Sequence, residues 1–303
     1  MSELSTCTSY APVTVNMLDQ FARYCDVSKS SVTTYVRNLR HFFDWLAESG
    51  VHNPDRLTIM AYRDDLKARL KPTTVQNYLS AVKVFFEWTE TEGYYPNIAR
   101  KVKGAKVRRY NRKECLAPTQ VTAVLDGMDC ETVQGARDYA VFRLMVTCGL
   151  RTVEVMNLTV EDVTTRCGKP VVMVLGKGCE EKTAVALPPK VEAAIRAYWK
   201  KAGIKNGPAF QSTSNNSKGA AISVRTVSKI AKEALKAAGY DKPTLTAHSL
   251  RHTAVTTTLN AGQSVQAAQA FARHSDVSTT MIYYHDIQYA ANQCAYVNEQ
   301  AYG

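Results

Sequence analysis

Residues 272–285 read ARHSDVSTTMIYYH. Two threonines, two tyrosines and two histidines lie in this one segment, in which Tyr283 follows His274 by nine residues. A tyrosine hydroxyl can act as a nucleophile that holds a reaction intermediate covalently. Tyrosines at helical spacing are more often core residues, so the segment by itself leaves both interpretations open. Tyr284 lies about 100° further around a helix than its neighbour and is expected to face elsewhere.

A second segment, residues 246–252, reads TAHSLRH. On a helix, His248 and Arg251 share one face, and a cation beside a histidine suits the binding of an anion. His248 and His252 are also spaced like a zinc pair, but the glutamate of an HExxH motif is missing and Arg251 would repel a metal. Only two acidic residues lie between positions 244 and 291, too few carboxylates for a two-metal nuclease. We therefore predict no metal and no cofactor.

Two further segments each carry one cation. Arg151 follows Gly149, where one helix is predicted to stop and the next to begin, so its planar side chain can point into a cleft. A surface arginine or a structural arginine–glutamate pair is the ordinary alternative. Lys177 lies between two glycines in a hairpin tip that joins predicted strands at 171–175 and 183–187. It has room there to approach a ligand, although most hairpin tips are simply solvated.

Together the four segments resemble the tyrosine recombinase, or phage integrase, family, and the resemblance covers nearly the whole chain. In that family an arginine follows Gly-Leu, a lysine sits in a Gly-Lys-Gly hairpin tip, and the motifs HxLRH and HSxxxTTxxY supply the remaining groups. The catalytic residues that the resemblance implies are Arg151, Lys177, His248, Arg251, His274 and Tyr283, the nucleophile. The family often has Leu-Gly before the second histidine. This chain has Phe271-Ala272-Arg273 there, and the added charge is expected to bear on specificity or assembly.

These residue types suit the cutting of DNA without a metal. Tyr283 can form a phosphotyrosine ester that retains the energy of the phosphate bond. Arg151 and Arg251 can bind the non-bridging phosphate oxygens, on which charge builds up in the transition state. Lys177 is the expected general acid for the leaving 5′-oxygen, and the two histidines are expected to assist proton transfer and to bind the phosphate.

The first third of the chain carries a faint internal repeat with an offset of 43 residues (78 − 35). Its first copy includes Tyr35, Phe42 and Trp45, and its second includes Tyr78, Phe85 and Trp88. Both copies end near a glycine, as helices often do. We predict a helical DNA-binding domain over residues 10–98, a basic linker over 99–114 and a catalytic domain over 115–303.

The predicted fold class is mainly α. It combines an all-helical N-terminal core-binding (SAM-like) domain with a mixed α+β catalytic domain that contains a small β-sheet or hairpin. Most of the chain from residue 190 to the end is predicted to be helical.

The net charge of +11 indicates a polyanionic partner. Residues 100–113 contain eight cations and no acid, which we interpret as a tether along phosphates in preference to a merely solvated one. Basic helix faces are usually only solvated, and that is the ordinary alternative for the basic residues of the first domain. The candidate DNA-binding residues are Arg37, Arg40, Lys71, Thr73, Thr74, Gln76, Lys83, Arg108 and Arg109.

The sequence argues against a membrane protein and against a secreted one. It has no apolar run of ~18 residues and no signal-peptide pattern at its start. Its eight cysteines are scattered without a CxxC pair, which predicts free thiols in a reducing compartment. We expect a cytoplasmic protein associated with a bacterial nucleoid.

We therefore predict a site-specific tyrosine recombinase that cleaves and rejoins DNA through a 3′-phosphotyrosine intermediate, in the integration or excision of a mobile genetic element. Xer-type chromosome-dimer resolution, a type IB topoisomerase and a catalytically silent DNA-binding regulator remain alternatives. The partners implied are double-stranded DNA recombination sites, a homo-tetramer on two sites, and accessory DNA-bending or excision factors. An apolar stripe near the C-terminus is expected to dock into a neighbouring protomer. It consists of Ile287, Ala290, Cys294, Val297 and Ala301.

Overall fold

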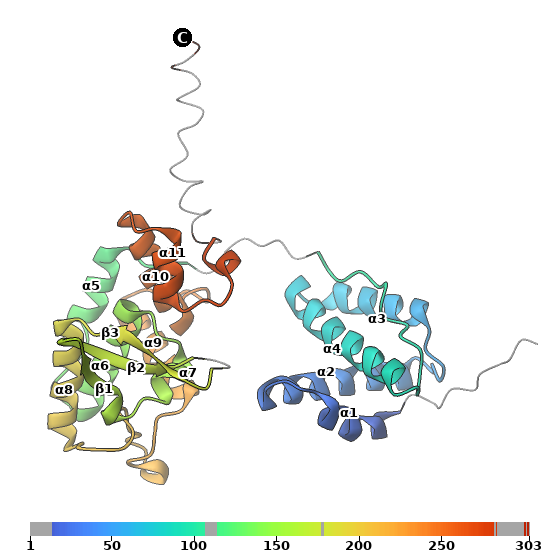
Figure 1. The fold of residues 1–303 in the computed structure, drawn as a ribbon, viewed down its shortest axis with the longest axis horizontal. Coiled ribbons are helices and arrows are strands. Elements are labelled where there is room, and N and C mark those ends of the chain that lie inside the picture. Colours follow the sequence, from blue (N-terminus) through green and yellow to red (C-terminus); the bar gives the residue numbers. More distant parts are fainter. Residues whose placement is uncertain are drawn as a thin grey trace, which may run out of the picture. The chain divides into compact units, whose positions relative to one another are not determined.

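The computed structural model describes residues 14–106, 114–176, 179–281, 283, 300 and 302. The chain divides into two compact units, Met1–Arg108 and Arg109–Gly303, each with a hydrophobic core of its own (Figure 1). The predicted fold class, mainly α with one small sheet, is confirmed. No helix in these described ranges is long and apolar enough to cross a membrane.

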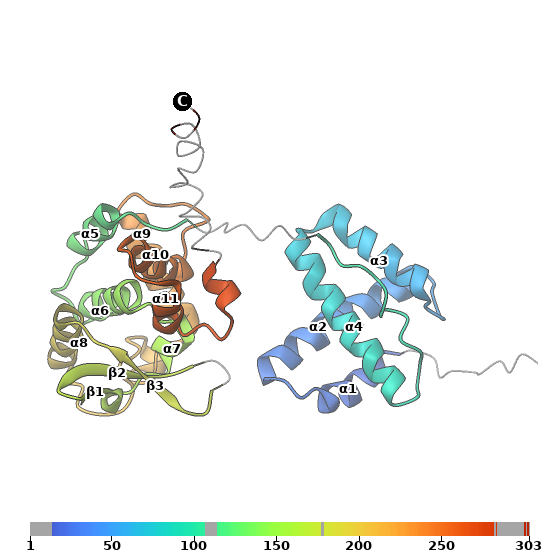
Figure 2. The same cartoon turned by 45° about the horizontal axis from the view of Figure 1, so that its top comes forward.

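The first unit is helical wherever it has regular structure (Figure 2). Its elements are η1 (Val15–Met17), α1 (Leu18–Tyr24), α2 (Lys29–Glu48), α3 (Arg56–Arg69) and α4 (Pro72–Thr91). The two copies of the repeat are α2 and α4, which pack against each other through rings such as Phe43 and Phe85, 5.5 Å apart. Gly50 and Gly93 follow the two helices with φ of +64° and +72°, the left-handed conformation that lets a chain leave a helix sharply.

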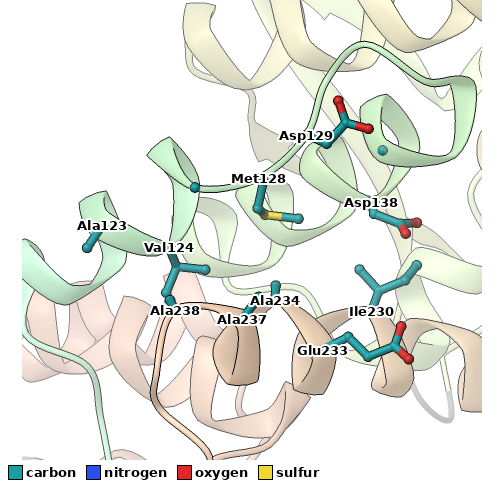
Figure 3. Close-up of a pocket in the computed structure, with 12 residues that line it drawn as sticks. Ala123, Val124, Met128, Asp129, Asp138, Ile230, Glu233, Ala234, Ala237 and Ala238 are labelled. Atoms are coloured by element: carbon teal, nitrogen blue, oxygen red, sulfur yellow. The ribbon is translucent and has the colours of Figure 1, made fainter.

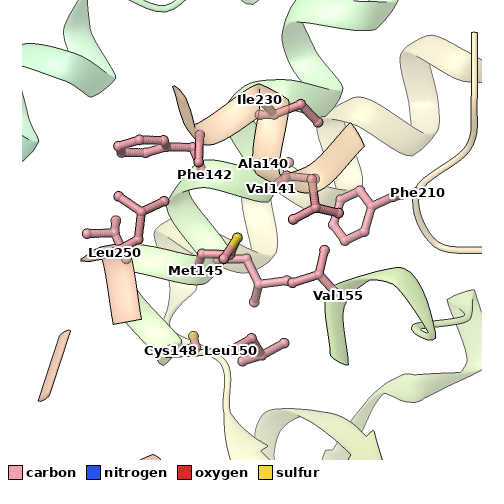
Figure 4. Close-up of a cluster of buried hydrophobic side chains, with 14 of the residues drawn as sticks. Ala140, Val141, Phe142, Met145, Cys148, Leu150, Val155, Phe210, Ile230 and Leu250 are labelled. Atoms are coloured by element: carbon pink, nitrogen blue, oxygen red, sulfur yellow. The ribbon is translucent and has the colours of Figure 1, made fainter. Parts of the chain in front are cut away.

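The second unit is built around one buried helix. Its helices are α5 (Pro118–Asp126), α6 (Val133–Cys148), α7 (Thr152–Met156), η2 (Val160–Asp162), α8 (Pro189–Ala202), η3 (Asn215–Ser217), α9 (Val224–Ala237), α10 (Ala247–Asn260) and α11 (Val265–Ala272). Helix α6 contacts α5, α7, α8, α9 and α10, and residues such as Val141, Phe142 and Met145 are buried in the main core (Figure 4). The end of α6 is therefore held firmly, which matters because the candidate site begins there.

A three-stranded antiparallel sheet completes the second unit. Its strands β1 (Val163–Arg166), β2 (Lys169–Leu175) and β3 (Lys182–Ala186) lie in the order β1-β2-β3. The β2–β3 hairpin agrees with the two predicted strands, whereas β1 was not predicted. The backbone N–H of Cys179 donates to the carbonyl of Gly176 at 3.2 Å across the hairpin tip. Lys177 lies outside the described residues.

The helical structure predicted for most of the chain from residue 190 onward does not extend through residues 203–223. Apart from η3, this segment is irregular, with isolated bridges from Pro208 to Thr159 and from Gln211 to Ala221. Its glycines have positive φ values (Gly203 +70°, Gly207 +78°, Gly219 +83°) and its centre is rich in Ser and Asn. Both features favour turns over helix, and they outweigh the apolar residues between them.

Candidate active site

The position of Arg151 depends on a glycine that ends helix α6. Gly149 has φ +64°, a backbone conformation that favours glycine, and a Cβ there would make a tight contact of 3.2 Å with Cε1 of Phe271. The chain turns sharply and Arg151 becomes the N-cap residue of α7. The predicted helix end at Gly149 is confirmed, and Arg151 lies at the junction with a side chain that is 28% exposed.

Arg251 comes to the same place from α10, and it is almost completely buried, with 1% exposure. Its Nη1 donates to the carbonyl of Gly149 at 2.6 Å and its Nη2 donates to the carbonyl of Ala272. Its Nε is buried and has no hydrogen-bond partner among the residues that the structure describes. Burial, aided by the charges of Arg151 and Arg273, lowers the pKa of Arg251 to about 10, so it remains charged at neutral pH.

Glu154 is a fully buried carboxylate on which three arginines converge. It accepts from Nη1 and from the backbone N–H of Arg151, each at 2.7 Å, and from Nη2 of Arg273 at 2.8 Å. Nη1 of Arg251 lies 4.0 Å away. Burial by itself raises the pKa of Glu154, but the charge of Arg273 and the hydrogen bonds outweigh it, and the pKa lies below its ordinary value. Glu154 is therefore ionised, and the cluster keeps a formal excess of two positive charges (3 − 1).

His274 is held by a hydroxyl from the segment that carries Tyr283. Its Nδ1 lies 2.9 Å from Oγ1 of Thr280, which is fully buried. Burial, followed by the charges of Arg251 and Arg151, lowers the pKa of His274 to about 4. The ring is neutral at neutral pH and carries a single proton, so its hydrogen-bond partners decide which nitrogen can donate.

Tyr283 packs into this corner of the second unit with only 5% of its surface exposed. Its ring centroid lies 4.6 Å from that of His252 and 6.1 Å from that of His274, the latter pair nearly parallel. Burial raises the pKa of Tyr283, while the charges of Arg251 and Arg151 oppose that rise. The hydroxyl is thus protonated at neutral pH, and it must lose its proton to act as a nucleophile.

His248 is exposed at the start of α10, in contrast to Arg251 on the same helix. Its ring lies 4.8 Å from that of His252, edge to face, and the ring of His252 in turn contacts Tyr283. The charge of His248 also acts on the pKa of His274. The structure thus brings together five of the six predicted catalytic residues, namely Arg151, His248, Arg251, His274 and Tyr283. The sixth, Lys177, is not among the described residues.

Lys182, the first residue of β3, has its ammonium group paired with a carboxylate. Its Nζ lies 2.5 Å from Oδ1 of Asp162, a buried carboxylate that also accepts from the backbone N–H of Thr159 at 2.9 Å. This contact holds the ammonium group of Lys182 against η2.

Four residues of the cluster were not predicted as site residues: Glu154, His252, Arg273 and Thr280. Glu154 could have been found as the glutamate three residues after Arg151, the spacing of a pair on one turn of helix. Arg273 had been noted only as a departure from the family pattern. Its contact with Glu154 spans 119 residues of sequence, so no local spacing reveals it.

The predicted DNA-binding residues of the first unit lie on α2 and α4 or next to them. Arg37, Arg40, Lys71 and Thr73 are exposed, whereas Thr74, Gln76 and Lys83 are half-buried. The side chain of Gln76 packs so closely on Gly104 that a Cβ at that glycine would collide with it. Gln76 is therefore better explained as a packing residue than as a DNA contact. Arg108 and Arg109 lie outside the described residues.

Neither a metal site nor the cavity of the second unit accounts for this cluster. Within the described ranges, no three His, Cys, Asp or Glu side chains come together as a metal site would require. A cavity of about 280 Å³ lies between α5, α6 and α9, with Met128, Asp129, Asp138 and Glu233 in its lining (Figure 3). None of its lining residues is a predicted catalytic residue.

Comparison with known proteins gives a consistent result. Residues 114–289 match the family model described as phage integrase family, and residues 18–93 match the one described as phage integrase, N-terminal SAM-like domain. Tyrosine recombinase XerD of Pseudomonas putida is 30% identical over 90% of this chain and 92% of that protein, and XerD of Caulobacter vibrioides is 30% identical over 85% and 86%.

Solved structures share the fold at low sequence identity. The XerH site-specific recombinase bound to a palindromic difH substrate, in a post-cleavage complex, matches with a TM-score of 0.77 at 19% identity over 94% of this chain and 85% of that one. A lambda integrase tetramer bound to a Holliday junction matches with a TM-score of 0.70 at 16% identity over 90% and 78%.

Proposed function

Because the chain belongs to the phage integrase family, and is thus a tyrosine recombinase that transfers DNA strands, we propose that the cluster around Glu154 is its active site and that Tyr283 is the nucleophile. The observation that carries this proposal is the convergence of Arg151, Arg251 and His274 next to the buried ring of Tyr283. Cations and a neutral histidine beside a tyrosine suit a reaction in which a phosphodiester gains negative charge.

In the proposed reaction, the oxygen of Tyr283 attacks the phosphorus and forms a 3′-phosphotyrosine bond as the bond to the 5′-oxygen breaks. Arg151 and Arg251 bind the non-bridging oxygens, since each retains donors that its contacts with the protein do not use. Lys177 gives a proton to the leaving 5′-oxygen, and His248 assists removal of the proton from Tyr283. The 5′-hydroxyl of another strand then attacks the ester and restores a phosphodiester, so no bond energy is lost to water.

His274 is proposed to donate from Nε2 to a phosphate oxygen. The contact of its Nδ1 with Thr280 supports this role, because a hydroxyl that donates to Nδ1 leaves the single ring proton on Nε2. The domain assignment is proposed on the same basis: residues 10–98 grip DNA, residues 99–114 link the domains along phosphates, and residues 115–303 carry out catalysis.

The biological role proposed is integration or excision of a mobile element, acting on double-stranded DNA sites at the nucleoid. Four protomers on two sites would form the working complex, a proposal supported by the tetrameric assembly of the similar lambda integrase. Accessory DNA-bending or excision factors would assist. Xer-type resolution of chromosome dimers is the second candidate, and the similarity to XerD proteins over 90% of the chain favours it.

Covalent capture on genomic DNA tests these proposals together. The protein is incubated with genomic DNA of its host and denatured, and the DNA fragments that remain attached to it are sequenced. Wild type and Tyr284→Phe should retain DNA, and Tyr283→Phe should retain none although it still binds DNA. An adduct with Tyr283→Phe would refute the assignment of the nucleophile. Fragments from the two ends of an inserted element support integration, whereas one chromosomal site supports dimer resolution.

A further inference from the structure

Arg273 has a backbone conformation that a residue with a Cβ seldom adopts. It ends helix α11 with φ +52° and ψ +47°, in the left-handed region. Such a conformation persists in a non-glycine residue when its surroundings hold the side chain in place. The reason for an arginine at this position must therefore lie in its side-chain contacts.

The side chain of Arg273 points into the protein and uses its donors there. Its Nη2 donates to Oε2 of Glu154 at 2.8 Å and to the carbonyl of Gly149 at 3.3 Å, and its Nη1 donates to the carbonyl of Phe271 at 2.9 Å. Only 10% of the side chain is exposed, and its Nε is buried without a hydrogen-bond partner among the described residues. Arg273 is thus placed to act on Glu154 and not to contact DNA itself.

Glu154 has a second arginine within reach of the same oxygen. Nη1 of Arg251 lies 4.0 Å from Oε2, too far for a hydrogen bond, and donates to the carbonyl of Gly149. A buried carboxylate is costly unless cations and donors satisfy it. Without Arg273, Oε2 keeps the backbone N–H of Arg151 but loses its guanidinium partner, and the guanidinium of Arg251, 4.0 Å away, would be drawn from its present position toward it.

We propose that Arg273 is a positioning residue: it satisfies Glu154 and so leaves Arg251 in place to bind the scissile phosphate. This inference rests on the proposed function, in which Arg151 and Arg251 bind that phosphate. Arg273 also sets the charge of the site, because its loss would reduce the formal excess from two positive charges to one. A transition state that gains negative charge is stabilised less by the smaller excess.

The test is the single-turnover rate of covalent adduct formation on a nicked DNA site recovered by genomic capture. Arg273→Met should react roughly ten- to a hundredfold more slowly, a smaller loss than removal of a direct transition-state donor. Arg273→Lys should recover most of the rate, because an ammonium group can still pair with Glu154. Arg196→Met is the matched control, since Arg196 pairs with Glu192 at 2.7 Å on the exposed face of α8, and its rate should equal that of wild type.

A double-mutant cycle shows whether Arg273 acts through Glu154. In a Glu154→Gln background, Arg273→Met should cost less than about threefold, because residues that act through one another are not additive. If the Met variant does not fold, Arg273→Gly serves in its place, since glycine accepts the left-handed backbone. Additive losses, a wild-type rate in Arg273→Met, or no recovery with lysine would each overturn the proposal. A wild type that forms no adduct would instead overturn the proposed function.

Discussion

Replacement of Thr280 by valine tests whether one buried hydroxyl sets the proton position on His274. The two side chains have nearly the same volume, and Thr280 is fully buried, so the change removes a hydroxyl without opening a cavity. The hydroxyl lies 2.9 Å from Nδ1 of His274, and the pKa of about 4 keeps that ring neutral at pH 7. Valine leaves Nδ1 without this partner. The neutral ring protonated on Nδ1 and the neutral ring protonated on Nε2 then become similar in free energy.

The size of the effect follows from the strength of one hydrogen bond. A buried hydrogen bond contributes a net ~0.5–1.5 kcal/mol, and about 1.4 kcal/mol changes an equilibrium constant tenfold. Loss of the Thr280 hydroxyl should therefore shift the equilibrium constant between the two neutral forms of His274 by roughly two- to tenfold. Cleavage should slow by the smaller factor, about twofold, by which the fraction protonated on Nε2 falls. The melting temperature should fall slightly, because Nδ1 loses a partner in a mostly buried setting.

The assay compares single-turnover adduct formation at pH 7 with thermal unfolding of the same samples. Thr280→Ser keeps the hydroxyl and should cleave at close to the wild-type rate. Thr279→Val makes the same chemical change at the exposed neighbouring position and should have no effect on cleavage. A wild-type rate in Thr280→Val, while His274→Ala is impaired, would refute the role of the hydroxyl. A wild-type rate in His274→Ala would refute the role of the histidine itself.

Four further predictions concern other parts of the site. Gly149→Ala should destabilise the second unit by roughly 1–2 kcal/mol, the cost of a left-handed alanine, and an unchanged melting temperature would contradict the strain argument. A DNA substrate with a 5′-bridging sulfur has a leaving group that needs no proton, so it should restore cleavage by Lys177→Ala. Equal impairment on this substrate and on normal DNA would exclude Lys177 as the general acid, and Lys182 would be the next residue to test. Acidification from about pH 7 to about pH 5 should lower the melting temperature. In this range the unfolded chain takes up a proton at His274, whose ordinary pKa is 6.5, whereas the folded protein does not, because its His274 has a pKa of about 4. The same pH effect in His274→Gln would count against this explanation. Deletion of residues 287–303, which lie almost entirely outside the described residues, should leave single-site binding intact and abolish the two-site complex, so a truncated protein that recombines at the full rate would exclude docking in trans.

Much of the fold was predictable because it depends on local sequence patterns, such as the spacing of aromatic residues and the positions of glycines. The repeat of aromatic residues gave α2 and α4, and glycines marked where α6 and both repeat helices end. Strand β1 was missed, since Val163–Arg166 is a short and largely polar strand with one half-buried residue and three exposed ones. The irregular segment at 203–223 was not singled out within a stretch predicted to be mostly helical, although its glycines favour turns.

The candidate site was predictable for residues with a characteristic motif and not for those that act through tertiary contacts. Arg251 and Tyr283 were identified from motifs whose combination resembles a known family, and the structure brings them to one corner of the second unit. Glu154 and Thr280 lie inside the quoted motifs, but no role was predicted for them, because their importance comes from the atoms they meet after folding. A buried carboxylate that joins three arginines can be recognised only when segments far apart in sequence are side by side.

The ionic cluster also has a consequence for synthesis of the protein. Glu154 precedes its partner Arg273 by 119 residues, and Tyr283 follows Arg273 in the chain. A growing chain that has made Arg151 and Glu154 still lacks the cation that balances the carboxylate, and the tyrosine is added later again. A chain that ends before Arg273 lacks both this arginine and the proposed nucleophile, so under the proposed function it could not nick DNA even if its first unit were folded.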